Sequence, residues 1–211
     1  MNVTGIITEY NPFHNGHLYH LSEAKKNTNA DAIICVMSGN FVQRGGPAII
    51  DKWKRTEMAL NNGVDLIIEL PTYYAVSSAE FFAKGSVSIL HHLGVVNNLF
   101  FGSECGDVAK LTTLSKTLVN EDSKLKFLIK EHLAKGDTFA KAREKSLIEY
   151  LKDEDINKII TSSNNILGIE YIKSILRLNS NITPSTLKRE GSNYNDKNLS
   201  NSFSSATAIR E

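Results

Sequence analysis

Short apolar segments alternate with amphipathic segments along the first half of the chain, and this alternation limits the folds open to it more than any other feature. The apolar runs, bounded by glycine, proline or polar residues, are 3–8, 31–37, 64–71 and 97–104. The segments between them carry apolar residues at helical spacing, over about 16–26, 52–62 and 78–92. Asp51 stands where the N-cap of the second of these helices belongs. Buried strands that alternate with helices are typical of a parallel sheet covered on both faces, so we predict an α/β fold with a doubly wound parallel sheet.

The remainder of the chain adds helices to this core. We predict one domain over residues 1–211, with its core at about 1–110, a helical part at about 107–178 and a return to the sheet at 182–211. The mixed Lys and Glu of the helical part are most simply solvated helix faces. The polar stretch from Glu190 to Ser202 is where the composition favours disorder.

Composition and charge exclude several classes of protein. A net charge of +1 on 211 residues gives no overall field that would hold nucleic acid or an anionic membrane. The two cysteines, Cys35 and Cys105, form no CxxC pair, which favours a reducing compartment. No stretch reaches the length of a membrane span, and the N-terminus lacks the basic start of a signal peptide. We therefore expect a cytoplasmic protein with no membrane partner and no DNA partner.

The loop after the first apolar run has the features of an anion site. Ligands of doubly wound folds collect at the carboxyl ends of the strands, in loops that lead into helices. Gly16 permits close backbone approach there, and the helix that begins near it offers unpaired N–H groups. His14 and His17 follow in the loop and the first turn, and we expect their pKa values to lie near neutrality, where they can bind phosphate oxygens.

A metal site is the competing interpretation of His14, His17 and His20. A step of three residues carries the third position away from the first on a helix, and no Cys, Asp or Glu cluster accompanies the histidines. We therefore assign no metal ligands. His20 is expected to line the edge of the pocket rather than to act in catalysis.

The spacing of His14, Gly16 and His17 resembles the H-x-G-H signature of the nucleotidyltransferase superfamily. The second signature of that superfamily, a hydroxyl-rich turn followed by an arginine, is matched by Ser205, Thr207 and Arg210. Hydroxyl and N–H groups of such a turn can bind phosphates. Each motif alone has an ordinary structural explanation, and their pairing favours a phosphate site.

Longer blocks extend the resemblance over nearly the whole chain. The segments 5–21, 37–60, 63–85, 99–107, 162–175 and 204–211 together resemble the bacterial tRNA(Met) cytidine acetate ligase family. The resemblance implies a Rossmann-like nucleotidyltransferase core of the HUP type with additional helices. It also implies a two-step reaction: ATP activates acetate as acetyladenylate, and the acetyl group passes to the wobble cytidine of elongator tRNA(Met), giving N(4)-acetylcytidine.

The resemblance also implies the residues of the site. The residues implied to bind ATP are Ile7, Thr8, Glu9, Tyr10, Asn11, Pro12, Phe13, His14, Asn15, Gly16, His17, Leu18, Tyr19, His20, Gly102, Asn164, Arg189 and Ser205. His14 and His17 are expected to stabilise the α-phosphate transition state, and Thr207 and Arg210 to hold the β and γ phosphates. Mg²⁺ is expected with ATP, without an assigned carboxylate pair. The loop 38–46 is expected at the same edge of the sheet.

Two departures from the family accompany these expectations. Members are considerably longer, so we expect the tRNA-binding region that follows the second signature to be absent from this chain. Only the stretch from Lys173 to Arg189 leans basic, although tRNA enzymes usually carry a basic stripe. Two other functions remain open: an adenylyl- or cytidylyltransferase that acts on a small phosphorylated metabolite, and a non-catalytic RNA-binding module.

Overall fold

A parallel sheet forms the centre of the protein in the computed structural model, which describes residues 1–152, 156–189 and 209–210. Within these residues the sheet has five strands in the order β3-β2-β1-β4-β5. The strands are β1 (Val3–Thr8), β2 (Ala32–Ser38), β3 (Leu66–Leu70), β4 (Asn98–Ser103) and β5 (Thr183–Lys188). Every neighbouring pair is parallel. The chain leaves β1 for β2 on one side and later returns to β4 on the other, so the strand order reverses at the edge between β1 and β4.

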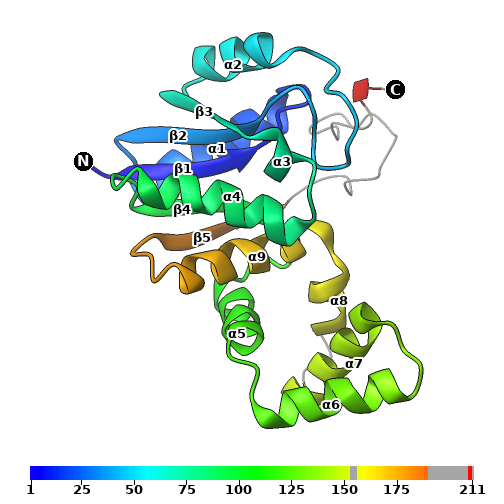
Figure 1. The fold of residues 1–211 in the computed structure, drawn as a ribbon. Helices are drawn as coiled ribbons and strands as arrows, with labels where there is room; N and C mark the ends of the chain where they lie inside the picture. Colours follow the sequence, from blue (N-terminus) through cyan, green and yellow to red (C-terminus); the bar gives the residue numbers. More distant parts are fainter. Residues whose placement is uncertain (153–155, 190–208, 211) are drawn as a thin grey trace.

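Helices cover both faces of the sheet and also extend beyond it (Figure 1). They are α1 (Asn15–Thr28), α2 (Lys52–Asn61), α3 (Thr72–Ala75), α4 (Ala79–His92), α5 (Val108–Val119), α6 (Ser123–Ala134), α7 (Phe139–Leu151), α8 (Ile156–Thr161) and α9 (Ser163–Arg177). Helices α5 to α8 connect β4 with α9 and lie mostly away from the sheet (Figure 1). The predicted α/β fold with a doubly wound parallel sheet is confirmed; the short helices α3 and α8 were not predicted.

Two hydrophobic cores, one on each face of the sheet, explain this arrangement. The core on the α4 and α9 side includes Val36, Leu90 and Ile172. The core on the α1 side includes Ile6, Leu21 and Phe100. Successive residues of a strand point to opposite faces, so the continuous apolar runs of the sequence supply both cores at once.

Turn and cap residues end these elements where the sequence indicates. The Asp51 side chain accepts hydrogen bonds from the backbone N–H groups of Trp53 and Lys54, which makes it the predicted N-cap of α2. Gly63 follows that helix with a φ of +98°, in the left-handed region that favours glycine. Both cysteines are free. Within the described ranges, no helix combines the length and the hydropathy that a bilayer crossing needs.

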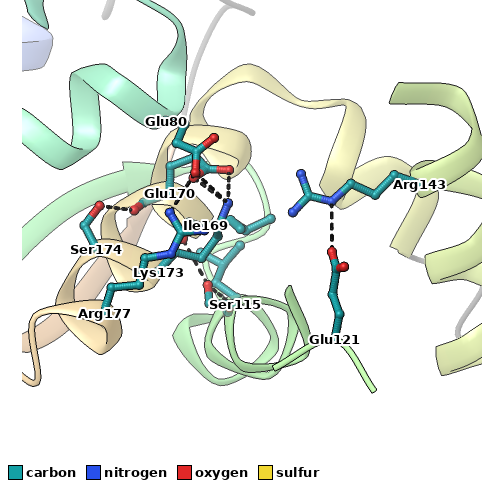
Figure 2. A network of polar contacts seen from close by, with 10 residues as sticks. Glu80, Ser115, Glu121, Arg143, Ile169, Glu170, Lys173, Ser174 and Arg177 are labelled. Carbon is teal, nitrogen blue, oxygen red and sulfur yellow. Dashed lines mark hydrogen bonds and ion pairs between the residues drawn. The ribbon is translucent and has the colours of Figure 1, made fainter. Parts of the chain in front are cut away.

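An ion-pair network joins α9 to α4, and it corrects one expectation from the sequence (Figure 2). Lys173, expected in a basic stretch, is buried, and its Nζ lies 2.7 Å from both carboxylate oxygens of Glu170. Arg177, one turn further on, pairs with Glu80 of α4 at 2.7 Å. Because Lys173 is buried and Arg177 is paired with a carboxylate at the surface, the stretch from Lys173 to Arg189 presents less basic surface than its composition indicates.

Candidate active site at the edge between β1 and β4

A pocket of about 270 Å³ opens where the strand order reverses. Its walls come from the end of β1 and the start of α1, the end of β4, the start of α9, the end of β5, and Arg210. Parts of the sequence that lie far apart therefore meet at one point. Ligands of doubly wound sheets bind at such a reversal, outside the carboxyl ends of the strands.

The helix α1 begins inside this pocket with a histidine as its N-cap. The Nδ1 atom of His14 accepts a hydrogen bond from the Gly16 backbone N–H at 3.1 Å. Because Nδ1 acts as the acceptor, the neutral ring carries its proton on Nε2 and can donate it to a ligand. A Cβ atom on Gly16 would lie 2.9 Å from Cε1 of His14, so this position tolerates only glycine without displacing the ring.

His17 and His20 follow on the pocket side of α1. The His17 ring stacks on His14 with centroids 3.7 Å apart, and it meets Tyr10 edge-on at 4.9 Å. His20 forms a hydrogen bond with the backbone of Phe101. The Nδ1 of His17 and the Nε2 of His20 are buried and have no partner among the described residues. Unpaired buried polar atoms are costly, so both atoms indicate a place for a polar ligand.

The protonation of these histidines differs from the expectation drawn from the sequence. Burial, with a smaller effect of Arg189, lowers the pKa of His14 to about 4. Burial, helped by the other two histidines and Arg189, lowers the pKa of His17 well below its usual value. The expected pKa values near neutrality are therefore wrong for the free protein. At neutral pH both rings are uncharged N–H donors, and the positive charge of the pocket belongs to its arginine and lysine side chains.

Gly102 and Arg189 form the wall contributed by β4 and β5. A Cβ atom on Gly102 would lie 3.3 Å from Cγ of Arg189. The aliphatic part of the Arg189 side chain therefore packs over the end of β4, at the position where Gly102 has no side chain. Arg189 also donates its backbone N–H to the carbonyl of Ser103 at 2.9 Å, which anchors it beside β4. Lys188 lines the pocket next to it. Arg189 lies close enough to the histidines to lower their pKa values, so its guanidinium is placed to hold an anion beside them.

Asn164 is held at the start of α9 by Glu104. The Glu104 carboxylate accepts from the side-chain amide of Asn164 at 2.8 Å and from the backbone N–H of Asn165 at 2.8 Å. Glu104 thus caps the helix and fixes the amide nitrogen of Asn164. The amide oxygen of Asn164 remains as an acceptor in the pocket wall.

The loop after β2 is bound to the loop after β1 by several polar contacts. Glu9 accepts from the backbone N–H of Gln43 at 2.8 Å, and Asn11 accepts from that of Ile49 at 2.9 Å. Gln43 and Arg44 line the pocket, as expected for the loop 38–46. Burial raises the pKa of Glu9, although the Gln43 hydrogen bond and nearby arginines act in the opposite direction.

The buried guanidinium of Arg55 joins the loop after β1 to the loop after β2. It donates to the backbone carbonyls of Glu9 at 2.5 Å, Ser38 at 3.1 Å and Ile50 at 3.0 Å, and also to that of Gly39. The Arg55 side chain is 0% exposed. Its role could not be inferred from the sequence, because nothing in the amphipathic pattern of α2 separates it from the neighbouring lysines.

Arg210 reaches the same pocket from the far end of the chain. Its Nη1 donates to the backbone carbonyl of Asn11 at 2.7 Å. The other residues of the predicted second signature, Ser205 and Thr207, lie outside the described residues. Arg210 of that signature therefore lies beside the loop after β1 that leads to His14, which we call the histidine loop, as the pairing of the two motifs predicts.

Most of the residues predicted to bind ATP line this pocket. They are Ile7, Thr8, Glu9, Tyr10, Asn11, His14, Gly16, His17, Tyr19, His20, Gly102, Asn164 and Arg189. Pro12, Phe13, Asn15 and Leu18 do not line it. Phe13 packs behind the site, with its ring centroid 4.8 Å from that of Tyr10.

Other lining residues were not predicted from the sequence. They are Ile6, Phe82, Phe101, Ser163, Leu167, Tyr171 and Leu187. Leu167 and Tyr171 follow Asn164 by three and seven positions, which places all three on one side of a helix. That spacing is the signal by which two of the missed residues could have been found.

Metal ligands are scarce in the described part of the chain. No group of three or more His, Cys, Asp or Glu side chains is arranged there to hold a metal ion. Among the described lining residues, Glu9 is the one carboxylate. Mg²⁺ is commonly held by substrate phosphates with one or two carboxylates, so this donor set fits an ion that is carried mainly by a nucleotide.

Comparison with known proteins gives the class of protein that this fold and site define. The family model described as HIGH Nucleotidyl Transferase matches residues 1–211. The chain therefore belongs to the HIGH nucleotidyl transferase family.

Individual relatives narrow the resemblance within that family. The chain is 57% identical over 211 residues to the tRNA(Met) cytidine acetate ligase of Clostridium novyi. The match covers 100% of this chain and 53% of that protein. It is 56% identical to the enzyme of the same name from Clostridium botulinum strain Hall, again covering 100% of this chain and 53% of that protein. The resemblance to the tRNA(Met) cytidine acetate ligase family is confirmed. The chain spans about half the length of the curated relatives it matches.

Solved structures agree with the sequence comparison. The apo crystal structure of Thermotoga maritima TmcAL matches with a TM-score of 0.96 and 45% identity, covering 100% of this chain and 51% of that one. A second crystal structure of that protein, bound with alpha-thio ATP, matches with a TM-score of 0.92 and 45% identity, covering 100% of this chain and 50% of that one.

Proposed function

We propose that this chain carries the ATP-dependent step of a tRNA(Met) cytidine acetate ligase. One observation carries the proposal: His14, His17, Asn164, Arg189 and Arg210 come from separate segments and line one pocket at the reversal of strand order. Neutral N–H donors beside guanidinium groups suit a nucleotide whose phosphate oxygens gain negative charge during the reaction. The resemblance to a protein that binds alpha-thio ATP supports the same ligand.

The first step joins acetate to the α-phosphate of ATP. A carboxylate oxygen forms a bond to the α-phosphorus, the bond from that phosphorus to the β-phosphate breaks, and pyrophosphate leaves. In our proposal, His14 and His17 donate hydrogen bonds to the α-phosphate, while Arg189 and Arg210 neutralise the phosphate charge. The protein forms no covalent bond, so its contribution is positioning and electrostatic stabilisation. Mg²⁺ would accompany the phosphates and neutralise part of their charge.

The second step transfers the acetyl group to RNA. The exocyclic amine of the wobble cytidine of elongator tRNA(Met) attacks the acetyl carbonyl carbon, AMP leaves with the carboxylate oxygen, and the amine loses a proton. The names of the relatives support tRNA(Met) as the acceptor. A cytoplasmic location, where tRNA and ATP are both present, is part of the proposal.

Isotope exchange tests the first step directly. The chain is incubated with ATP, Mg²⁺, acetate and labelled pyrophosphate, and the label in ATP is measured together with acetyladenylate by mass spectrometry. We expect acetate-dependent exchange, and we expect His17→Asn to lower it about 100-fold or more. His92→Asn is the matched control, because His92 is exposed in the last turn of α4.

Other outcomes identify the alternatives. Exchange that requires a phosphorylated metabolite and ignores acetate would assign an adenylyl- or cytidylyltransferase. Exchange that survives unchanged in His17→Asn would refute the role of the histidines. Addition of the tRNA, followed by nucleoside analysis for N(4)-acetylcytidine, tests the second step separately.

A further inference from the structure

The pocket has two ends of different chemistry, on opposite faces of the sheet. The polar end lies on the α1 face and holds His14, His17 and His20 together with Arg189. The other end lies on the α4 and α9 face and is lined by Ile7, Phe82, Phe101, Leu167 and Tyr171. We call these five residues the apolar chamber. A triphosphate requires donors and cations, so the apolar chamber is suited to a different part of the reactants.

Three of the five side chains that line the apolar chamber are buried. Phe82 is 3% exposed, and Phe101 and Tyr171 are each 5% exposed. The rings of Phe101 and Tyr171 meet edge-on with centroids 5.7 Å apart, which fixes one wall. A base that is part of a folded tRNA must enter from the open mouth of a site. Side chains this buried are better matched to a small molecule than to a base carried by a folded RNA.

One polar group faces the apolar chamber from α9. Tyr171 lines the pocket from α9. Burial, with a smaller effect of Glu9, raises the pKa of Tyr171, so the hydroxyl keeps its proton and can donate. An apolar cavity with a hydroxyl donor in its lining matches a short carboxylic acid, whose alkyl group is apolar and whose carboxylate accepts.

We propose that the apolar chamber binds the alkyl group of the short-chain carboxylate substrate, with Phe82 and Leu167 limiting its length and Tyr171 orienting its carboxylate. The inference rests on the proposed function, because it assigns the acid that ATP activates. It makes Phe82 and Leu167 specificity-determining residues and Tyr171 a positioning residue. The reacting carboxylate oxygen then lies between the apolar chamber and the histidines, where the α-phosphate is expected.

Variants that change the size of the chamber test the length limit. Leu167→Ala enlarges the chamber from the α9 side. Phe82→Leu enlarges it from the α4 side and serves as a second variant if Leu167→Ala folds poorly. An extra methylene in a hydrophobic pocket changes discrimination by about 10-fold or more. We therefore expect either variant to raise binding of butyrate relative to acetate by at least about 10-fold. Leu176→Ala is the matched control, because Leu176 is a partly buried leucine of the same helix that does not line the pocket.

The measurement is made on binding as well as on reaction. Saturation-transfer NMR on the 211-residue chain, saturated with a non-hydrolysable ATP analogue, reports affinities for acetate and butyrate. Pyrophosphate exchange with the same acids reports the reaction. Tyr171→Phe should raise the half-saturating acetate concentration about 3-fold to 10-fold while the length preference stays as in the wild type. Tyr150→Phe, which removes a hydroxyl bonded to Asp122 outside the pocket, is its control.

The binding measurement and the exchange measurement together distinguish a failure of this inference from a failure of the proposed function. A shifted binding preference without any exchange would support the chamber and refute the ligase assignment. The opposite result is exchange with acetate while Leu167→Ala and Phe82→Leu keep the wild-type preference for acetate over butyrate. That result would refute the chamber and leave the ligase assignment intact. Loss of the acetate signal when the ATP analogue is added would show that the nucleotide occupies the chamber, and would also overturn the inference.

Discussion

The guanidinium of Arg210 donates a hydrogen bond to the backbone carbonyl of Asn11 at 2.7 Å, which joins positions 199 residues apart in the sequence. The contact places a cation of the second signature directly against the loop that carries the first. We predict that Arg210→Ala raises the KM for ATP about 10-fold or more, because a charge-assisted contact near the phosphates is lost. Arg210→Lys should recover only part of the effect, since an ammonium cannot copy the planar donor fork.

Pyrophosphate exchange at varied ATP concentrations gives this KM. Arg177→Lys serves as the control, because Arg177 pairs with Glu80 on the outside of α4 and α9. An unchanged KM in Arg210→Ala would contradict a role for this residue in nucleotide binding.

Gly16 is predicted to be intolerant of a side chain for a local reason. In Gly16→Ala the new Cβ would stand 2.9 Å from Cε1 of His14, so the ring must leave its place at the start of α1. We expect exchange to fall about 10-fold or more, while the free energy of unfolding changes by no more than about 1 kcal/mol, because alanine favours the helix. Gly46→Ala, where a Cβ meets nothing within 4 Å, should leave both quantities unchanged. Full activity in Gly16→Ala would contradict the positioning of His14.

The buried histidines predict a stability that depends on pH. The pKa values of His14 and His20 are lowered from 6.5 to about 4, chiefly by burial, so the unfolded chain binds protons more readily than the folded one. Their stabilising contribution is therefore complete above about pH 6.5 and is lost as the pH falls toward 4. Urea unfolding at pH 7.5 and pH 5 should show this loss.

A variant identifies the source of the pH dependence. His20→Gln cannot take up a proton, so its unfolding free energy should fall less between pH 7.5 and pH 5 than that of the wild type, by up to about 2 kcal/mol. His92→Gln should retain the full dependence of the wild type, because His92 is exposed. Equal slopes in His20→Gln and the wild type would contradict the lowered pKa.

Arg55 is predicted to be a structural requirement of the two loops. Arg55→Met leaves the backbone carbonyls of Glu9, Ser38, Gly39 and Ile50 without their buried donor. We expect a loss of about 3–5 kcal/mol in the free energy of unfolding, because several buried acceptors lose their partner at once. Arg55→Lys should recover only a part of this, since one ammonium cannot reach all four carbonyls. Chemical denaturation measures both, and a loss below about 1 kcal/mol would refute this role.

The sheet could be predicted because the spacing of apolar residues along the sequence distinguishes strands from helices. Apolar runs such as 31–37 become strands, and a cap such as Asp51 marks the start of a helix whatever surrounds it. Even the edge strand β5 was predicted despite Pro184, which edge positions tolerate. The short helix α3 was not predicted, because a single helical turn carries too few residues for a helical period to be recognised.

The candidate site could be predicted where residues form a motif or are implied by the resemblance to a known family. His14, Gly16 and His17 lie close together in the sequence, so their pattern by itself indicates an anion site. Phe82 and Arg55 lie at positions that tertiary packing alone brings to the site, and their local sequence is that of ordinary helices. The lowered pKa of His17 is likewise a consequence of burial, which the order of residues does not specify.

The order of the strands has a consequence for biosynthesis. Strand β5 joins β4 only after the whole helical excursion from α5 to α9 has been made. A nascent chain emerges from the ribosome N-terminus first, so the histidine loop is translated long before Asn164 and Arg189. The half of the pocket that the histidine loop forms is thus available early, and the half that α9 and β5 contribute is added last.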